Sequence, residues 1–439
     1  MKNKNAILDK IKLSDEIKEI LIKSPLCTFL NTRDEILSLA MGHQLHGQFE
    51  VAYDVPGHGR IVEATVAKCT NGLAVNYPTP YMRRRDPECM TVADPKQTDK
   101  IRYIDQFGVP FDSVRLETFD WLKKQNLAVM FFVLGGYGPE TGRGAMLIAP
   151  DNAGFFIGGL ADLQGMVPAE SIPEQFHIRS VIYLAPPFRH THFNGKQVVV
   201  HNRLNEIHEV FSYNLYPGPS AKKGVYGVLL SIGEDEGLPT LHGSTVQLVT
   251  PYDNITTIMH EGASGGGKSE MLEHVHREED GRLLIGENSV TGEKRYLALN
   301  QACTLRPVTD DMVLCMPAIK EKEYLWAKDA EQAWFVRVNH IKNYGTDPYL
   351  EKATIHPKEP LIFLNLRGVP DSTCLIWEHT EDSPGIPCPN PRVIIPRQLV
   401  AGIVNTEVEV MIRSFGIRTP LCTKEKPSYG IAGYLHILP

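Results

Sequence analysis

Short apolar runs alternate along the chain with stretches rich in glycine, proline and charged residues. Runs that stop at glycine or proline are typical of buried strands, whereas apolar residues recurring every three or four positions indicate a helix. The spacing predicts helices over 6–23 and 113–124. The first strands are predicted at 127–135, 145–149 and 196–200. This part of the chain is therefore predicted to mix helices and strands.

The pattern changes after residues 213–224, where two prolines and two glycines predict a loop. Apolar runs then follow one another closely, and we predict that strands dominate 225–320. The prediction is an α/β protein with mixed, partly antiparallel sheets, divided into an N-terminal α/β domain (1–224, the substrate side) and a second domain (225–439). The later runs are VYGVLLSIG at 225–233, STVQLVT at 244–250, ITTIMHEG at 255–262, and shorter ones at 312–316, 361–365 and 374–377.

The composition narrows the class of protein. With 42% hydrophobic and 22% charged residues the chain is typical of a globular protein, and its net charge of -7 argues against a general nucleic-acid binder. No apolar run has the length of a signal peptide at the N-terminus or of a membrane span elsewhere. We therefore expect a cytoplasmic protein with no nucleic-acid or membrane partner. The eight cysteines include no C-x-x-C pair, which excludes a zinc ribbon.

The most specific motif is GASGGGKS at residues 262–269, which satisfies the phosphate-loop pattern G-x-x-x-x-G-K-[ST]. Glycines permit positive φ and let successive backbone N–H groups face a polyphosphate. Lys268 is expected to reach the β- and γ-phosphates, and the Ser269 hydroxyl to ligate Mg²⁺ or Mn²⁺. The predicted nucleotide-binding residues are Gly262, Ala263, Ser264, Gly265, Gly266, Gly267, Lys268 and Ser269.

Both flanks of this motif support its interpretation. A strand-like run at 255–259 precedes it, and the helix-like segment SEMLEHVHREE follows it. A metal bound to the phosphates also needs a carboxylate. Asp310 and Asp311, at the start of the run at 312–316, are predicted to supply it, the alternative being an ordinary solvated turn. Glu270 is a second candidate, although its charge could equally favour the N-terminus of the helix.

The order of motifs between residues 221 and 271 resembles the core of phosphoenolpyruvate carboxykinases. Lys222 and Lys223, the segment LHGS at 241–244 and the P-loop match that family's lysine pair, Met-His-x-Ser segment and G-x-S-G-x-G-K-[ST] loop in order. The resemblance covers residues 140–400. It implies a carboxykinase-like nucleotide- and metal-binding domain over 225–439, truncated at the C-terminus relative to the family.

The resemblance also implies a metal site. Lys223 and His242 would hold a catalytic Mn²⁺, and Asp310 or Asp311 would be the third protein ligand, beside Ser269 of the loop. A lysine can ligate a metal only as a neutral amine, which requires that burial and the metal lower its pKa.

Substrate contacts are implied at two arginines. Arg143, in a Thr-Gly-Arg segment, would grip a carboxylated substrate, and Arg392, in an Asn-Pro-Arg-Val segment, would stabilise the transferring phosphoryl group. With Lys268 and Lys223 they are the implied catalytic residues. The implied reaction converts oxaloacetate and ATP into phosphoenolpyruvate, ADP and CO₂, or acts on a related small carboxylic acid. The serine at position 264 favours ATP over GTP.

One departure from the family affects the metal site. By its Leu-Ile-Gly context the family's acidic pair aligns with Glu287 and Asn288, which leaves no aspartate at the metal position. Residues 275–305 are interpreted as an inserted hairpin with its turn at Thr291 and Gly292. With this insertion, Asp310 and Asp311 take the place of the acidic pair.

Two other functions stay open. The loop with Glu270 also resembles HPr kinase/phosphorylase, which would make the substrate a serine on a small protein, and a non-catalytic nucleotide-binding regulator is the third hypothesis. Two further segments could bind ligands or be solvated loops. They are the arginines at 83–85, for a phosphate or carboxylate, and His190 with His192, for a metal.

Overall fold

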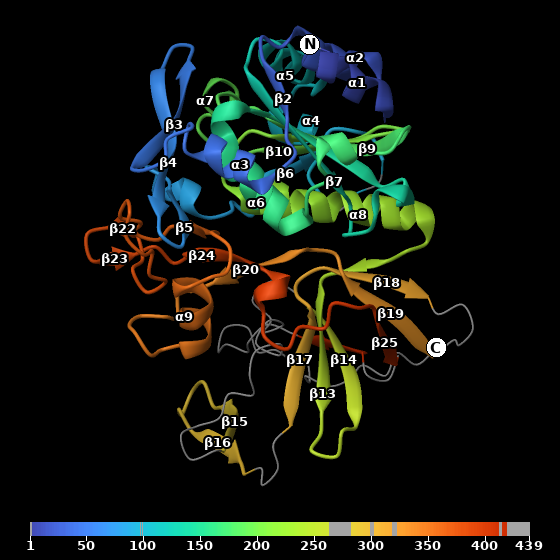
Figure 1. Ribbon diagram of the computed structural model, residues 1–439. Helices are drawn as coiled ribbons and strands as arrows, with labels where there is room; N and C mark the ends of the chain where they lie inside the picture. Colours follow the sequence, from blue (N-terminus) through green and yellow to red (C-terminus); the bar gives the residue numbers. More distant parts are fainter. Residues whose placement is uncertain are drawn as a thin grey trace. The chain divides into compact units, whose positions relative to one another are not determined.

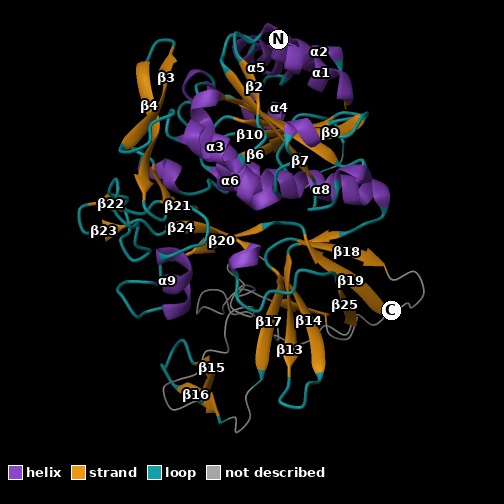
Figure 2. Ribbon diagram, in the orientation of Figure 1, coloured by secondary structure: helices purple, strands orange, loops and turns teal. Residues whose placement is uncertain are grey.

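A computed structural model describes residues 2–96, 98, 100–262, 282–298, 303–317, 323–411 and 415–418 (Figure 1). The chain divides into two compact units, the first formed by 1–228 with 332–399 and the second by 229–331 with 400–439. Helices and strands alternate in the first unit, and strands predominate in the second (Figure 2). The predicted α/β class with mixed sheets is confirmed.

Two sheets form the first unit. One is a mixed sheet with the strand order β2 (Cys27–Phe29), β7 (Leu127–Val133), β8 (Gly144–Pro150), β9 (Phe176–Leu184), β11 (His208–Ser212), β10 (Val199–Arg203), β6 (Met90–Val92). The short strand β1 (Ile11–Lys12) also pairs with β9. The other has the order β20 (Ala333–Arg337), β24 (Arg392–Pro396), β21 (Leu361–Leu364), β5 (Gly72–Asn76), β4 (Gly59–Cys69), β3 (Gln48–Val55). A small pair, β22 (Glu381–Ser383) and β23 (Ile386–Pro387), stands apart from both sheets.

Helices complete this unit. They are α1 (Lys2–Lys10), α2 (Asp15–Lys23), α3 (Arg33–Ala40), α4 (Tyr103–Phe107), α5 (Asp112–Leu122), α6 (Gly154–Gln164), α7 (Phe188–Thr191), the first part of α8 (Lys223–Glu236), and α9 (Pro348–Ile355). Short turns of 3₁₀-helix occur at Pro80–Arg83, Pro139–Thr141, Asp151–Ala153, Ala169–Ser171 and Arg397–Leu399, and a π-helical turn at Gly218–Lys222.

The buried strand β7 and the buried helix α6 explain how the two sheets share a core. Val129 and Phe131 of β7 join a cluster with α1, α2 and α5, and every residue of β7 is buried. A strand covered on both faces has a continuous apolar sequence, as the run at 127–135 has. Every residue of α6 is buried too, and α6 contacts β7 of one sheet and β20, β21 and β24 of the other. A helix that is apolar on all sides needs such a position between layers.

The second unit contains two four-stranded sheets that enclose a small core. One sheet has the order β12 (Thr240–Leu241), β18 (Val313–Pro317), β19 (Tyr324–Asp329), β25 (Val408–Met411), and the other β17 (Thr304–Thr309), β13 (Gly243–Val249), β14 (Ile255–Gly262), β26 (Phe415–Arg418). Met259, Val308, Val313, Ala327 and Val410 belong to the core. A separate antiparallel hairpin joins β15 (Leu283–Glu287) and β16 (Lys294–Leu297), and Gly292 in its turn has φ +71°. The predicted hairpin is thus confirmed, and its interpretation as an insertion stays a prediction.

The observed division into two units differs from the predicted domain boundary at residue 224. Residues 332–399 belong to the first unit because β21 pairs in parallel with β5, which precedes it by 289 positions (Leu361 pairs with Gly72). Gly72 permits this pairing, since a Cβ there would lie 1.9 Å from the carbonyl oxygen of Leu361. Such a long-range strand pair leaves no local pattern in the sequence.

Several predicted elements are corrected. The run at 225–233 lies in α8 and is not a strand, because an apolar run alone does not separate a buried strand from a buried helix. The predicted loop at 213–224 ends in the π-helical turn and the start of α8. Residues 374–377 form no strand, because the side chain of Asn71, and not a neighbouring strand, bonds both main-chain groups of Cys374. The helix predicted over 6–23 is interrupted by β1.

Within the described residues, the helices lack the combined length and apolarity that a membrane crossing requires.

A buried histidine pair predicts a loss of stability in acid. His201 of β10 and His208 of β11 are joined by a 2.8 Å hydrogen bond between Nδ1 and Nε2. Burial lowers the pKa of His201 to about 4 and that of His208 well below its usual value. The unfolded chain binds these protons near pH 6.5, and the folded chain does so only at lower pH, so stability is expected to fall as the pH drops from about 6.5 through about 4.

Urea unfolding at a series of pH values measures this effect, with a limit of about 1.4 kcal/mol per pH unit for each histidine. The double variant His201→Gln/His208→Gln is the control, and its unfolding free energy should depend less steeply on pH over this range. Equal slopes for both proteins would contradict the prediction.

Candidate functional site

His242 and Asp311 meet where the chain passes between the two sheets of the second unit. His242 separates β12 from β13, and the pair Asp310–Asp311 separates β17 from β18. β12 pairs with β18, and β13 with β17, so both crossings fall at the same place. There the Nε2 atom of His242 lies 2.5 Å from Oδ1 of Asp311. Both side chains keep about a fifth of their surface exposed, at 22% and 19%.

The start of the phosphate-loop motif lies beside this pair. Gly262 is the last residue of β14, and its backbone N–H donates to the carbonyl oxygen of His242 at 3.1 Å. Gly243 makes the approach possible, since a Cβ there would stand 2.7 Å from the carbonyl oxygen of His260. The first residue of the motif is therefore hydrogen-bonded to the histidine that the resemblance assigns to a metal. Ala263, Ser264, Gly265, Gly266, Gly267, Lys268 and Ser269, and also Glu270, lie outside the described residues.

The turn that carries the two aspartates is held by a third. Asp329, at the end of β19, is buried, and its carboxylate accepts hydrogen bonds from the backbone N–H groups of Asp310 at 3.1 Å and Glu331 at 2.9 Å. Asp311 has φ +66°, a left-handed conformation that aspartate tolerates better than most residues. The conformation turns the chain so that Asp311, and not the buried Asp310, contacts His242.

These groups have the chemistry of a site for a divalent cation. Imidazole nitrogen and carboxylate oxygen are ligands for Mn²⁺, and carboxylate and hydroxyl oxygens suit Mg²⁺. His242 and Asp311 together could hold such an ion near Gly262, the first residue of the motif. No group of three His, Cys, Asp or Glu side chains able to hold a metal occurs in the described part of the chain.

The other residues predicted for the site belong to the first unit. Lys223 begins α8, is half-buried, and holds its Nζ 5.5 Å from the ring centre of Tyr226. Its neighbour Lys222 is the more deeply buried of the two. Arg143 is buried with its guanidinium 5.0 Å from the ring centre of Tyr137. Lys223 and His242, which the resemblance assigns to one metal, therefore belong to different units. Arg392, predicted in the second domain, belongs to the first unit with Arg143, because β24 pairs with β20 and β21 there.

Arg392 is positioned by a network of neutral groups. Its Nε donates to Oδ1 of Asn390 at 2.9 Å, and one terminal nitrogen donates to the carbonyl oxygen of Phe335 at 2.8 Å. The amide of Asn390 in turn donates to the Tyr216 hydroxyl at 2.8 Å. Asn390 and Tyr216, which lie far apart in sequence, therefore orient the arginine together.

In the two other candidate segments, 83–85 and 189–192, several side chains already bind carboxylates of the first unit. Arg83 bonds Asp382 at 2.9 Å, and Arg84 pairs with the same carboxylate. Arg189 and His190 both bind the buried carboxylate of Glu63, at 2.9 and 2.5 Å. These contacts give both segments a structural role.

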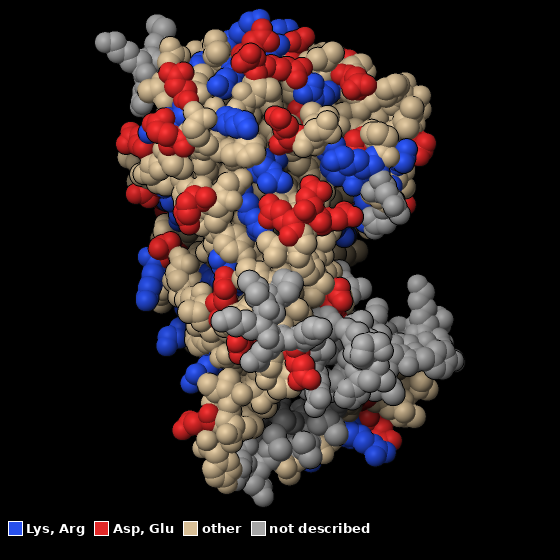
Figure 3. All heavy atoms as spheres, turned by 90° about the vertical axis from the view of Figure 1, so that its right-hand side faces the viewer, with Lys and Arg blue, Asp and Glu red and all other residues tan. Residues whose placement is uncertain are grey.

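Asp329 was not identified from the sequence. It is the last residue of the run YLWAKD, and no local pattern there marks its hydrogen bonds to the backbone of Asp310 and Glu331. On the face drawn in Figure 3, acidic and basic side chains are interspersed over the described surface and form no continuous basic area.

Comparison with curated proteins finds no match. The family model described as "Domain of unknown function (DUF4914)" matches residues 13–439, which is nearly the whole chain, and the protein therefore belongs to this family.

Proposed function

We propose that this protein binds ATP with a divalent cation and transfers a phosphoryl group between the nucleotide and a small carboxylic acid. The observation that carries the proposal is the meeting of His242, Asp311 and Gly262. An imidazole and a carboxylate, which are side chains of the types that can ligate a metal, lie beside the first residue of a sequence that satisfies the phosphate-loop pattern.

The reaction that fits best is the carboxykinase reaction. Oxaloacetate loses CO₂, and the electron pair of the broken C–C bond passes to an enolate oxygen that attacks the γ-phosphate of ATP, giving phosphoenolpyruvate and ADP. The cation would offset the negative charge that develops on the substrate and phosphate oxygens. His242 and Asp311 would hold it, while Lys268 would stabilise the transferring phosphoryl group.

Arginine supplies the remaining charge in this proposal. A guanidinium can bind carboxylate and phosphate oxygens through paired hydrogen bonds. Arg143 would bind the substrate carboxylate, and Arg392 the phosphoryl oxygens. The bonds from Arg392 to Asn390 and Phe335 fix its orientation before any ligand arrives, which is what electrostatic stabilisation of a transition state requires.

The test is the formation of phosphoenolpyruvate and ADP from oxaloacetate and ATP with Mn²⁺, and separately with Mg²⁺. Lys268→Ala is expected to abolish product, and a chelator is expected to do the same to the unaltered protein. Nucleotide binding is measured in parallel with a fluorescent ATP analogue.

The proposal fails in two distinguishable ways. If nucleotide binds but no product forms from oxaloacetate or related acids, the carboxykinase reaction is excluded. Phosphate transfer to a serine of a small protein would then indicate the HPr-type activity. Binding without any turnover would indicate a regulatory protein.

A further inference from the structure

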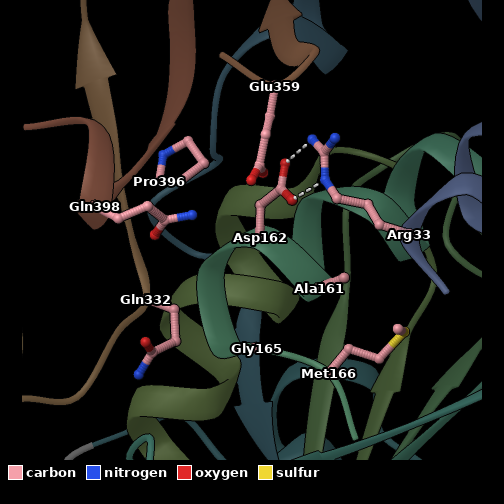
Figure 4. Close-up of a pocket in the computed structure, with 9 residues that line it drawn as sticks. All are labelled: Arg33, Ala161, Asp162, Gly165, Met166, Gln332, Glu359, Pro396 and Gln398. Carbon is pink, nitrogen blue, oxygen red and sulfur yellow. Dashed lines mark hydrogen bonds and ion pairs between the residues drawn. The ribbon is translucent and has the colours of Figure 1, made fainter. Parts of the chain in front are cut away.

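A cavity of about 260 Å³ opens within the first unit at the C-terminal end of α6 (Figure 4). α6 ends at Gly165, which has φ +81° and whose N–H bonds the carbonyl oxygen of Ala161. Segments distant in sequence complete the wall, among them Gln332 before β20 and Gln398 after β24. Nothing in the proposed phosphoryl transfer uses these residues.

Two carboxylates face this cavity, and one guanidinium accompanies them. Arg33 binds Asp162 through two hydrogen bonds, Nε to Oδ1 at 2.7 Å and Nη2 to Oδ2 at 2.9 Å. The Asp162 side chain is only 4% exposed. The side chain of Glu359, an exposed residue, directs its carboxylate toward that of Asp162 (Figure 4). Since Arg33 neutralises one carboxylate, the cavity keeps an excess negative charge.

The surroundings add to this negative potential. Burial, together with the charge of Glu359, raises the pKa of Asp162 although Arg33 acts in the opposite direction. The C-terminal end of a helix also carries a partial negative charge. The charge of Glu359 and the helix end both favour a positive group beside Asp162, whereas burial by itself disfavours the ionised form of this carboxyl.

We propose that this cavity binds the ammonium group of a small organic amine. The ammonium would lie between the carboxylates of Asp162 and Glu359, and the amides of Gln332 and Gln398 could accept or donate further hydrogen bonds.

The carbon skeleton of the amine would contact an apolar part of the cavity wall. Ala161, Met166 and Pro396 form the apolar part of the wall, which suits a short alkyl chain. A divalent metal fits less well, because both oxygens of Asp162 already accept from Arg33 and the guanidinium charge lies beside them. The volume is below that of a site for a drug-sized ligand and so selects small amines.

Isothermal titration calorimetry of the full chain tests the proposal at constant ionic strength. The probes are butylammonium, methylammonium, sodium and succinate. Butylammonium is expected to bind severalfold more tightly than methylammonium because of the apolar wall, and sodium and succinate are expected not to bind. Glu359→Gln should weaken butylammonium binding about tenfold by removing the excess charge without altering the shape. Glu88→Gln, which changes an exposed carboxylate elsewhere in the same unit, should leave binding unchanged.

Three results would overturn the proposal. They are the absence of amine binding up to roughly 100 mM, equal affinity in Glu359→Gln, and binding of sodium as tight as that of butylammonium, which would indicate a plain monovalent-cation site. The same titration on Lys268→Ala separates this site from the phosphate loop, because amine binding should persist there whether or not the protein transfers phosphate.

Discussion

Arg115→Ala is expected to lower the free energy of unfolding by about 3–5 kcal/mol. Arg115 of α5 donates to both carboxylate oxygens of Glu209 at 2.8 Å, and Glu209 is completely buried in β11. The same guanidinium binds Glu16 of α2 at 2.8 Å and 3.1 Å. Removing it leaves a buried carboxylate with a neutral amide, that of Asn202, as its closest remaining donor. An uncompensated buried charge is among the most destabilising defects known in folded proteins.

Chemical denaturation of the variant measures this loss. Arg60→Ala is the matched control, because Arg60 makes a single ion pair with Glu50 in which both side chains are about half exposed, and its removal should cost less than about 1 kcal/mol. The double variant Arg115→Met/Glu209→Gln should recover much of the stability, since it removes the buried charge together with its partner. A loss in Arg115→Ala no larger than in Arg60→Ala would show that Glu209 finds another way to be compensated.

Asp311→Asn is expected to reduce Mn²⁺-dependent product formation by about 10- to 100-fold while leaving the fold intact. Asparagine tolerates the positive φ at this position, so the turn between β17 and β18 should keep its conformation. What is lost is the negative charge beside Nε2 of His242. A titration of activity against Mn²⁺ should therefore shift to higher metal concentration, and thermal unfolding should change little.

Asp253→Asn is the control for this variant. Asp253 is also an aspartate of the second unit with positive φ, but it lies exposed in the turn between β13 and β14. Full activity in Asp253→Asn with loss in Asp311→Asn would tie the effect to the pair with His242. Unchanged metal dependence in Asp311→Asn would remove Asp311 from the metal site and leave Asp310 as the remaining aspartate of the predicted pair.

Elements with a strong local pattern were predicted closely. The continuous apolar run at 127–135 corresponds to β7, and STVQLVT and ITTIMHEG to the paired strands β13 and β14. The hairpin of β15 and β16 was located from its Thr-Gly turn. In these cases the residues that determine the structure are neighbours in the chain, so the sequence shows the pattern directly.

The assignment of α8 failed for a physical reason. Its apolar residues at 225–233 satisfy a buried strand and a buried helix equally well, and only the packing around it separates the two. A similar ambiguity applied to the aspartates. The sequence offered Asp310 and Asp311 as equivalent candidates, and the backbone conformation held by Asp329 directs Asp311 toward His242.

The sequence by itself determined the α/β class, the strands with continuous apolar runs, and the presence of a phosphate-loop motif, a histidine and an acidic pair, because each depends on residue type and short-range spacing. Only the tertiary structure decided that β21 pairs with β5, that His242 touches Asp311, and that Asp162 and Glu359 share one cavity. These contacts join residues separated by tens to hundreds of positions. They depend on how sheets and helices pack, a property that no local pattern records.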